Sequence, residues 1–98
     1  MTENKRLEGE TDQRRRRLRY RAWHRGTREM DLVLGRFVDA ELAGMSDHEV
    51  AELETLMDAA DPDLFAWVLG QADVPEHVNT PIFRRLAKFN HAGKGSQD

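Results

Sequence analysis

The strongest constraint on the fold is a one-sided apolar stripe in the middle of the chain. From Met30 onward, apolar residues recur at the i, i+3, i+4 and i+7 spacing of an amphipathic helix: Met30, Val33, Leu34, Phe37, Val38 and Leu42. A single short helix is not stable in water, so other helices must cover this stripe. Signals for strands are weak throughout, and we therefore expect an all-α fold.

Capping residues indicate where the next helix begins. Gly44 is predicted to end the first stripe by adopting the left-handed conformation. Ser46 and Glu49 then have the spacing of a capping box, which opens a second helix. The apolar face of that helix consists of Val50, Leu53, Leu56, Met57 and Ala60.

A third start signal follows in the sequence "DPD". Asp61 is predicted to be the N-cap, Pro62 the first helical residue, and Asp63 an acid near the positive end of the helix dipole. Gly70 is the predicted stop. The sequence "NTP" at residues 79–81 repeats the cap-plus-proline pattern and opens a last helix with Ile82, Phe83, Leu86 and Phe89.

The remaining segment, "RRRRLRYRAWH", is also compatible with a helix, which brings the number of expected helices to five. We therefore predict a small five-helix bundle over residues 14–89, with flexible polar tails at 1–13 and 90–98. The chain has 98 residues, which corresponds to one domain, and no cysteine that could staple it.

Charge is distributed unevenly along the chain. The net charge is −3, yet eight arginines and no acid lie between Arg14 and Arg28, whereas thirteen acids and one base lie between Glu29 and Glu76. This asymmetry indicates charged partners, or attraction between the two parts of the molecule. The run Arg14–Arg17, with Tyr20 and Trp23 nearby, could bind a nucleic acid. A pI of about 5.8 and the many acids argue against that alternative.

The sequence shows no constellation typical of an enzyme. The four histidines have no metal-ligand spacing, the two serines are a helix cap and a tail residue, and no glycine-rich phosphate loop is present. We expect a protein that is not an enzyme and holds neither a metal nor a stably bound cofactor. The longest apolar fragment, "LFAWVLG", is too short to span a membrane, and the N-terminus lacks a secretory hydrophobic region. We expect a bacterial cytoplasmic protein.

The stretch "WHRGTREMD" is more charged than a helix junction requires. Gly26 suits a helix end, and Glu29 and Asp31 suit the start of the next helix, but Arg25 and Arg28 are left unexplained. If this loop projects, Arg25 offers a rigid fork of five donors, and Gly26 lets another backbone come close. The residues alone leave a structural junction and a binding loop equally open.

Trp67 allows two interpretations as well. It lies at the margin of an apolar face, which favours a partly buried core residue. The alternative is an exposed aromatic anchor for a partner.

The residues Arg25-Gly26-Thr27-Arg28-Glu29 match an RGxxE signature. Together with "SDHE" and "DPDLFAW", in this order, they resemble the succinate dehydrogenase flavin assembly factor family, over a stretch from about Leu18 to Phe89. The resemblance does not include the arginine run or the acidic N-terminal tail.

The resemblance implies a five-helix bundle that binds the flavoprotein subunit of succinate dehydrogenase, and in bacteria that of fumarate reductase. It further implies a chaperone that promotes covalent attachment of FAD to a histidine of this client. We expect the client-binding loop to contain His24, Arg25, Gly26, Arg28, Glu29 and Asp31. A secondary client contact is expected at Asp61, Pro62, Asp63 and Trp67. The rival hypotheses are a nucleic-acid-binding protein and a module that binds another protein through the same loop.

Overall fold

The computed structural model describes the backbone of residues 2–95 and the side chains of residues 12–91. This part of the chain contains five α-helices, one short 3₁₀ helix and no strand. The elements are α1 (Thr2–Trp23), α2 (Arg28–Glu41), η1 (Leu42–Gly44), α3 (Asp47–Leu56), α4 (Asp61–Val68) and α5 (Pro81–Gly95). The predicted all-α five-helix bundle is confirmed.

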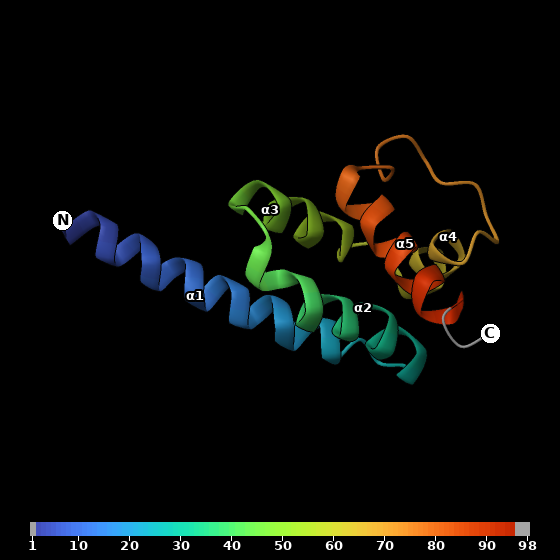
Figure 1. Ribbon diagram of the computed structural model, residues 1–98, viewed down its shortest axis with the longest axis horizontal. Helices are drawn as coiled ribbons and strands as arrows, with labels where there is room; N and C mark the ends of the chain where they lie inside the picture. The colour runs from blue at the N-terminus through green and yellow to red at the C-terminus, as the bar shows by residue number, and fades with distance from the viewer. Residues whose placement is uncertain (1, 96–98) are drawn as a thin grey trace.

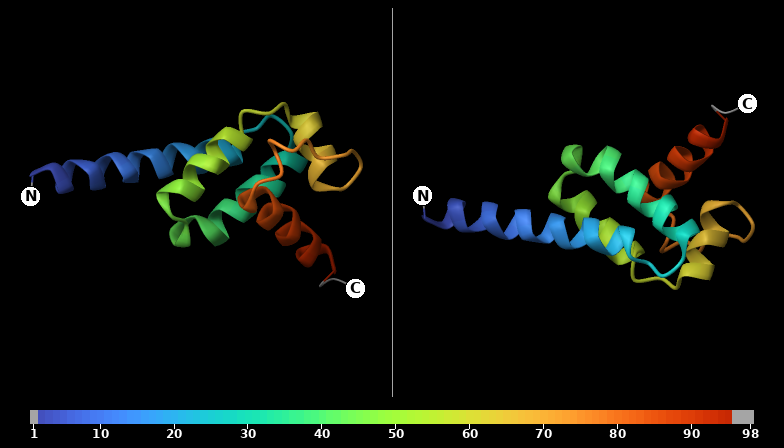
Figure 2. Two further views of the ribbon diagram at one scale, coloured as in Figure 1. Left: turned by 90° about the horizontal axis from the view of Figure 1, so that it is seen from above. Right: turned by 90° about the horizontal axis from the view of Figure 1, so that it is seen from below.

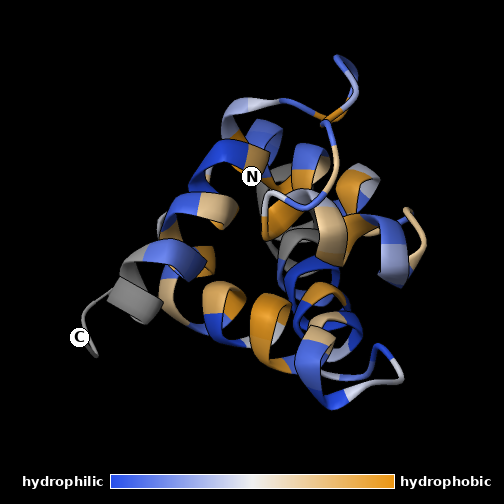
Figure 3. Ribbon diagram, turned by 90° about the vertical axis from the view of Figure 1, so that its right-hand side faces the viewer, coloured by the Kyte–Doolittle hydropathy of each residue, from blue (hydrophilic) through white to orange (hydrophobic). Residues whose placement is uncertain are grey.

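One apolar core joins the five helices. The C-terminal half of α1 lies along α2, α4 and α5 contact α2, and α3 packs against α5 (Figures 1 and 2). Every member of the predicted stripe from Met30 to Leu42 is buried, and Phe37 is the largest fully buried side chain. Colouring by hydropathy shows apolar residues on the inner faces of the helices and polar residues on their outer faces (Figure 3). The stripe on α2 is thus the centre of the fold.

Two helices are longer than the sequence pattern predicts. Helix α1 begins at Thr2 rather than at Arg14, and α5 continues to Gly95 rather than ending near Phe89. Neither added segment contains a proline, the residue that most strongly breaks a helix. The N-terminal part of α1 projects beyond the rest of the bundle (Figure 1). The domain limits 14–89 and the flexibility of both tails stay predictions.

The predicted start signals of α3 and α5 are confirmed by their hydrogen bonds. Ser46 Oγ accepts from the backbone N–H of Glu49 at 3.1 Å, and Glu49 Oε1 accepts from the backbone N–H of Ser46 at 2.8 Å, forming a complete capping box. At the start of α5, Thr80 Oγ1 accepts from the backbone N–H of Phe83 at 3.2 Å.

Of the two glycines predicted to stop a helix, one was predicted wrongly. Gly70 has a positive φ of 74° and ends α4 as expected, but Gly44 does not adopt positive φ. Helix α2 instead tightens into η1, and the backbone N–H of Met45 donates to the carbonyl of Leu42 at 3.1 Å. Arg15 donates to the carbonyls of both Leu42 and Met45, at 2.6 and 2.8 Å. These bonds satisfy the helix end without a left-handed residue.

The close approach of α1 and α2 depends on Gly35. This residue is buried in the middle of α2, and the indole ring of Trp23 packs directly against it. The indole Nε1–H donates to Asp39 Oδ2 at 3.2 Å, which holds the ring in this position. A side chain at position 35 would occupy the space of the ring.

We predict that Gly35→Ala lowers the free energy of unfolding. The added Cβ would lie 2.7 Å from Trp23 Cε3 and closer still to Cδ2 and Cε2, so the indole ring must move. Overpacking of this kind costs about 1–3 kcal/mol. Urea denaturation followed by circular dichroism measures the change. Gly44→Ala is the matched control, because nothing lies within 4 Å of its added Cβ. Equal losses in both variants would contradict the packing argument.

We also predict that the capping box loses part of its stabilising effect in acid. The hydrogen bond from the Ser46 backbone, aided by Arg85, lowers the pKa of Glu49 below its usual range. A lowered folded-state pKa contributes stability that is complete above the unfolded pKa of about 4.3 and is lost as the pH falls through the folded value. Glu49→Gln should therefore be less stable than the native chain at about pH 7, and the difference should shrink near pH 3. A difference independent of pH, in urea titrations, would refute this.

Candidate partner-binding site

The guanidinium of Arg25 is directed into the protein. Nε donates to Asp61 Oδ1 at 2.8 Å, Nη1 to the carbonyl of Met57 at 2.7 Å, and Nη2 to the carbonyl of Ala59 at 3.1 Å. Nη2 also lies 2.7 Å from Asp61 Oδ1, and the side chain is 11% exposed. The sequence left open whether this fork projects from the loop. In the structure its donors instead hold the turn between α3 and α4.

Asp61 was predicted wrongly to be the N-cap of α4. The N-cap is Ala60, which makes no capping hydrogen bond through its side chain, and Asp61 is the first helical residue. The carboxylate of Asp61 accepts the charged hydrogen bond from Arg25 instead, and its side chain is only 20% exposed. The long-range partner thus determines the role of this acid. Pro62 falls within the first two helical positions, where its missing N–H costs nothing.

Two further contacts fix the loop that carries the RGxxE signature. The backbone N–H of Arg25 donates to Asp31 Oδ1 at 2.7 Å. Thr27 is the N-cap of α2, and its Oγ1 accepts from the backbone N–H of Met30 at 3.3 Å. The sequence analysis missed this role of Thr27, although a threonine three residues before the apolar stripe is a recognisable signal.

Gly26 lies at the tip of this loop with a positive φ of 111°. An L side chain rarely adopts this backbone conformation, so glycine is required by the chain path itself. Nothing lies within 4 Å of a Cβ built at this position, so the space beside Gly26 is open. The residue meets both conditions discussed above: it permits the helix junction, and its backbone is accessible.

Three charged or titratable residues of the loop face outward. The side chains of His24, Arg28 and Glu29 are exposed. Arg28 and Glu29 form no hydrogen bond or ion pair through their side chains within residues 12–91. His24 Nδ1 lies 2.7 Å from the carbonyl of Tyr20, and its ring stacks on that of Tyr20 at a centroid distance of 3.9 Å. The loop therefore presents an acid and a base with unused hydrogen-bonding capacity.

The structure brings the two predicted surfaces together through Arg25. A hollow of about 440 Å³ lies between the end of α1 and the α3–α4 turn, and its lining includes Tyr20, His24, Arg25 and Asp61. Pro62 and Asp63 are exposed beside Asp61. Trp67 lies on α4 and is partly buried against the core, as its first interpretation predicts, and its role as a contact for a partner stays a prediction.

The arginines of α1 bind the acidic body of the molecule. Arg14 donates to Glu54 at 2.7 Å, Arg21 to Asp58 at 3.1 Å, and Arg19 lies 3.4 Å from Asp39. Arg15 donates to the carbonyls at the end of η1 described above. Of the two explanations for the uneven charge, attraction between the parts of the chain is therefore confirmed for these residues. Nothing in these contacts supports the nucleic-acid alternative.

The family described as "Flavinator of succinate dehydrogenase", Sdh5, matches residues 16–90. The chain belongs to this family. A comparison with solved structures found no significant match.

Three curated relatives illustrate the similarity. The FAD assembly factor SdhE of Acetobacter pasteurianus is 39% identical over 82 residues, which cover 84% of this chain and 75% of that protein. Proteins named succinate dehydrogenase assembly factor 2, mitochondrial, are 32% identical in Dictyostelium discoideum and 37% identical in Arabidopsis thaliana. These matches cover 76% and 82% of this chain, but only 53% and 44% of the relatives.

Among the described residues, no group of three or more His, Cys, Asp or Glu side chains could hold a metal ion. No helix in the same part of the chain combines the length and the apolar character needed to cross a membrane.

We predict that Arg25→Lys destabilises the fold and displaces the loop. A single ammonium group cannot reach Asp61 and the carbonyls of Met57 and Ala59 together, and each buried acceptor left without a donor costs about 1–3 kcal/mol. Amide cross-peaks of both the loop and the α3–α4 turn should shift in NMR spectra, together with a lower midpoint in urea. Arg28→Lys, at an exposed position, should change stability by less than about 0.5 kcal/mol. Equal effects of the two substitutions would show that Arg25 does not hold the turn.

Proposed function

We propose that this chain is an assembly factor that binds the flavoprotein subunit of succinate dehydrogenase, and that of fumarate reductase where present, and promotes covalent attachment of FAD. Membership of the family and the names of its curated relatives support this proposal. The observation that carries it for this chain is the loop itself, in which Arg28 and Glu29 are exposed and free while Arg25 anchors the backbone.

The proposed binding surface centres on Gly26 and Glu29. Glu29 would accept hydrogen bonds from the client, Arg28 would donate them, and the open backbone of Gly26 would allow close approach. His24, stacked on Tyr20, would extend this surface along the end of α1. Asp31 and Arg25 would act indirectly, because their polar groups are bonded within the loop and to the α3–α4 turn. Pro62 and Asp63 would contribute the secondary contact next to it, with Trp67 supporting α4 from the core side.

The proposed action is positioning rather than catalysis. The client supplies the reacting histidine and the site for FAD, and this chain would hold the client's domains so that the histidine and the flavin meet. Correct placement of two reacting groups can account for about 7–11 kcal/mol of a barrier. No residue of this chain is assigned to the chemical step, and FAD is treated as the client's ligand rather than as a stably bound cofactor of this chain. The bacterial cytoplasmic location stays a prediction from the sequence.

The decisive test is flavinylation of the client in the presence and absence of this chain. The flavoprotein subunit of succinate dehydrogenase from the same organism would be produced both ways and run on a denaturing gel. Flavin fluorescence in its band reports covalent FAD. We predict strong fluorescence with the native chain and at least about a tenfold loss with Glu29→Ala, the loss expected when a charge-assisted hydrogen bond of about 1.4 kcal/mol or more disappears.

A control substitution distinguishes the loss of a specific contact in the loop from the loss of any negative charge. Asp12 is an exposed acid on α1, about 18 Å from the loop by helical rise. Asp12→Ala should flavinylate the client as well as the native chain does. Equal fluorescence with and without this chain would overturn the proposed function. Equal loss in both variants would overturn the assignment to the loop.

A further inference from the structure

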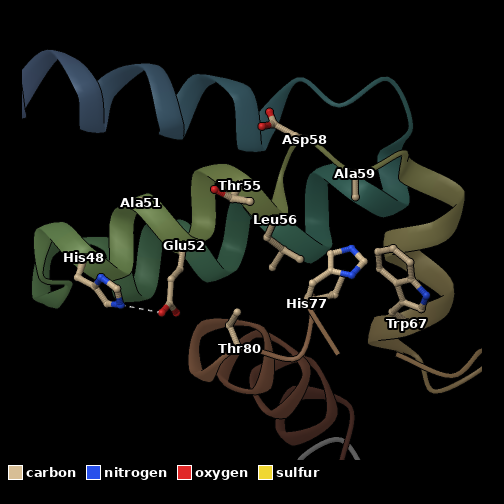
Figure 4. A pocket seen from close by; sticks show the side chains of 11 residues that line it. His48, Ala51, Glu52, Thr55, Leu56, Asp58, Ala59, Trp67, His77 and Thr80 are labelled. Atoms are coloured by element: carbon tan, nitrogen blue, oxygen red, sulfur yellow. Dashed lines mark ion pairs between the residues drawn. The ribbon is translucent and has the colours of Figure 1, made fainter. Parts of the chain in front are cut away.

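A second hollow lies where α3, α4 and the start of α5 meet, and neither the RGxxE loop nor the arginine run accounts for it. Its volume is about 450 Å³. Its apolar wall is formed by Ala51, Leu56, Ala59, Trp67 and Val78, and polar side chains line the rest: His48, Glu52, Thr55, Asp58, His77 and Thr80. Figure 4 shows Glu52 and Trp67 toward opposite ends of this groove, with Leu56 and His77 between them. The groove is separate from the loop, although both hollows reach the turn at Asp58 and Ala59.

One polar atom of a residue that lines this groove has no hydrogen-bond partner. Glu52 Oε1 is buried and has no hydrogen-bond partner within residues 12–91. The other oxygen, Oε2, lies 2.9 Å from His48 Nε2, whose own side chain is mostly exposed. A buried acceptor without a donor costs about 1–3 kcal/mol. Oε1 thus leaves the negative charge of Glu52 only partly compensated within the described residues.

The charged residues that line the groove indicate which kind of ligand group it favours. Glu52 and Asp58 line it, and no lysine or arginine does. Asp58 already accepts a hydrogen bond from Arg21, whereas Glu52 has only the exposed ring of His48 as a partner. A cationic side chain would form an ion pair with the Glu52 carboxylate and would place its aliphatic stem against the apolar wall. The volume exceeds that of one side chain, and the indole of Trp67 at the far end suits an apolar neighbour.

We propose that this groove binds a short segment of a partner polypeptide in which an arginine lies next to an apolar residue. The guanidinium pairs with the Glu52 carboxylate at one end of the groove, and the apolar side chain packs between Leu56, Val78 and Trp67. Arginine is the cation of choice because its planar fork can donate to a half-shielded carboxylate while its stem stays in contact with the wall. This binding is independent of flavin attachment and needs no residue of the RGxxE loop.

The test uses the full chain labelled with ¹⁵N and two peptides, acetyl-Leu-Arg-Leu-amide and acetyl-Leu-Glu-Leu-amide. The arginine peptide should produce saturable NMR shifts at the amides of Glu52, Thr55 and Val78 and at the indole Nε1–H of Trp67. The glutamate peptide should not. Equal shifts with both peptides, or none at the highest concentration reached, would overturn the proposal.

Variants locate the interaction. Glu52→Gln keeps an acceptor but removes the charge, and it should weaken binding of the arginine peptide about tenfold. Glu76→Gln, at an exposed acid that does not line the groove, should leave the affinity unchanged. Thr55→Phe places a large side chain into the groove from an exposed position on α3 and should abolish the shifts even if Glu52→Gln does not fold. Unchanged affinity in either Glu52→Gln or Thr55→Phe would contradict the assignment.

Discussion

The arrangement of the helices depends on arginines that donate to the carbonyl ends of neighbouring helices. Helices end with carbonyls that lack an intrahelical partner and carry the negative end of the dipole. Neither α2, η1 nor α3 has a basic residue in its last turn. Arg15 supplies the missing donors at the end of η1, and Arg25 supplies them at the end of α3. The basic segment of the sequence therefore completes helices that lie far from it along the chain.

Arg15 and Arg25 differ from the arginines of α1 that form exposed ion pairs. Arg21 and Asp58 are largely exposed, and such pairs contribute about 0–1 kcal/mol because water screens them. Arg25 and Asp61 are mostly buried, and their charges are matched by further hydrogen bonds to backbone carbonyls. Removing one partner of such a pair leaves a buried charge unpaired, which is costly. The exposed pairs therefore add little, whereas Arg15 fixes the end of η1 and Arg25 fixes the turn between α3 and α4.

The parts of the fold that could be predicted are those with local causes. The apolar stripe on α2, the capping box at Ser46 and the stop at Gly70 each depend on residues within a few positions of one another, and the sequence displays them directly. The left-handed conformation of Gly44 was predicted wrongly because Arg15, distant in sequence, donates to the carbonyl at that helix end. The N-cap role of Asp61 was predicted wrongly because its carboxylate accepts a hydrogen bond from Arg25, which is also distant in sequence. The groove at Glu52 was not predicted, since it exists only where three separated segments meet.

The RGxxE signature combines two different kinds of requirement. Arg25 points inward and Gly26 has a backbone conformation that other residues rarely adopt, so both are needed to build the loop. Glu29 points outward and forms no hydrogen bond or ion pair through its side chain within residues 12–91, so folding gains from it only a favourable interaction with the dipole of α2. The guanidinium of Arg25 anchors the loop and also bonds the carbonyls at the end of α3. The exposed Glu29 is therefore held at a fixed position relative to Asp61 and α4. A substitution at Arg25 would therefore affect partner binding through the geometry of the loop, whereas one at Glu29 would remove a contact and leave that geometry intact.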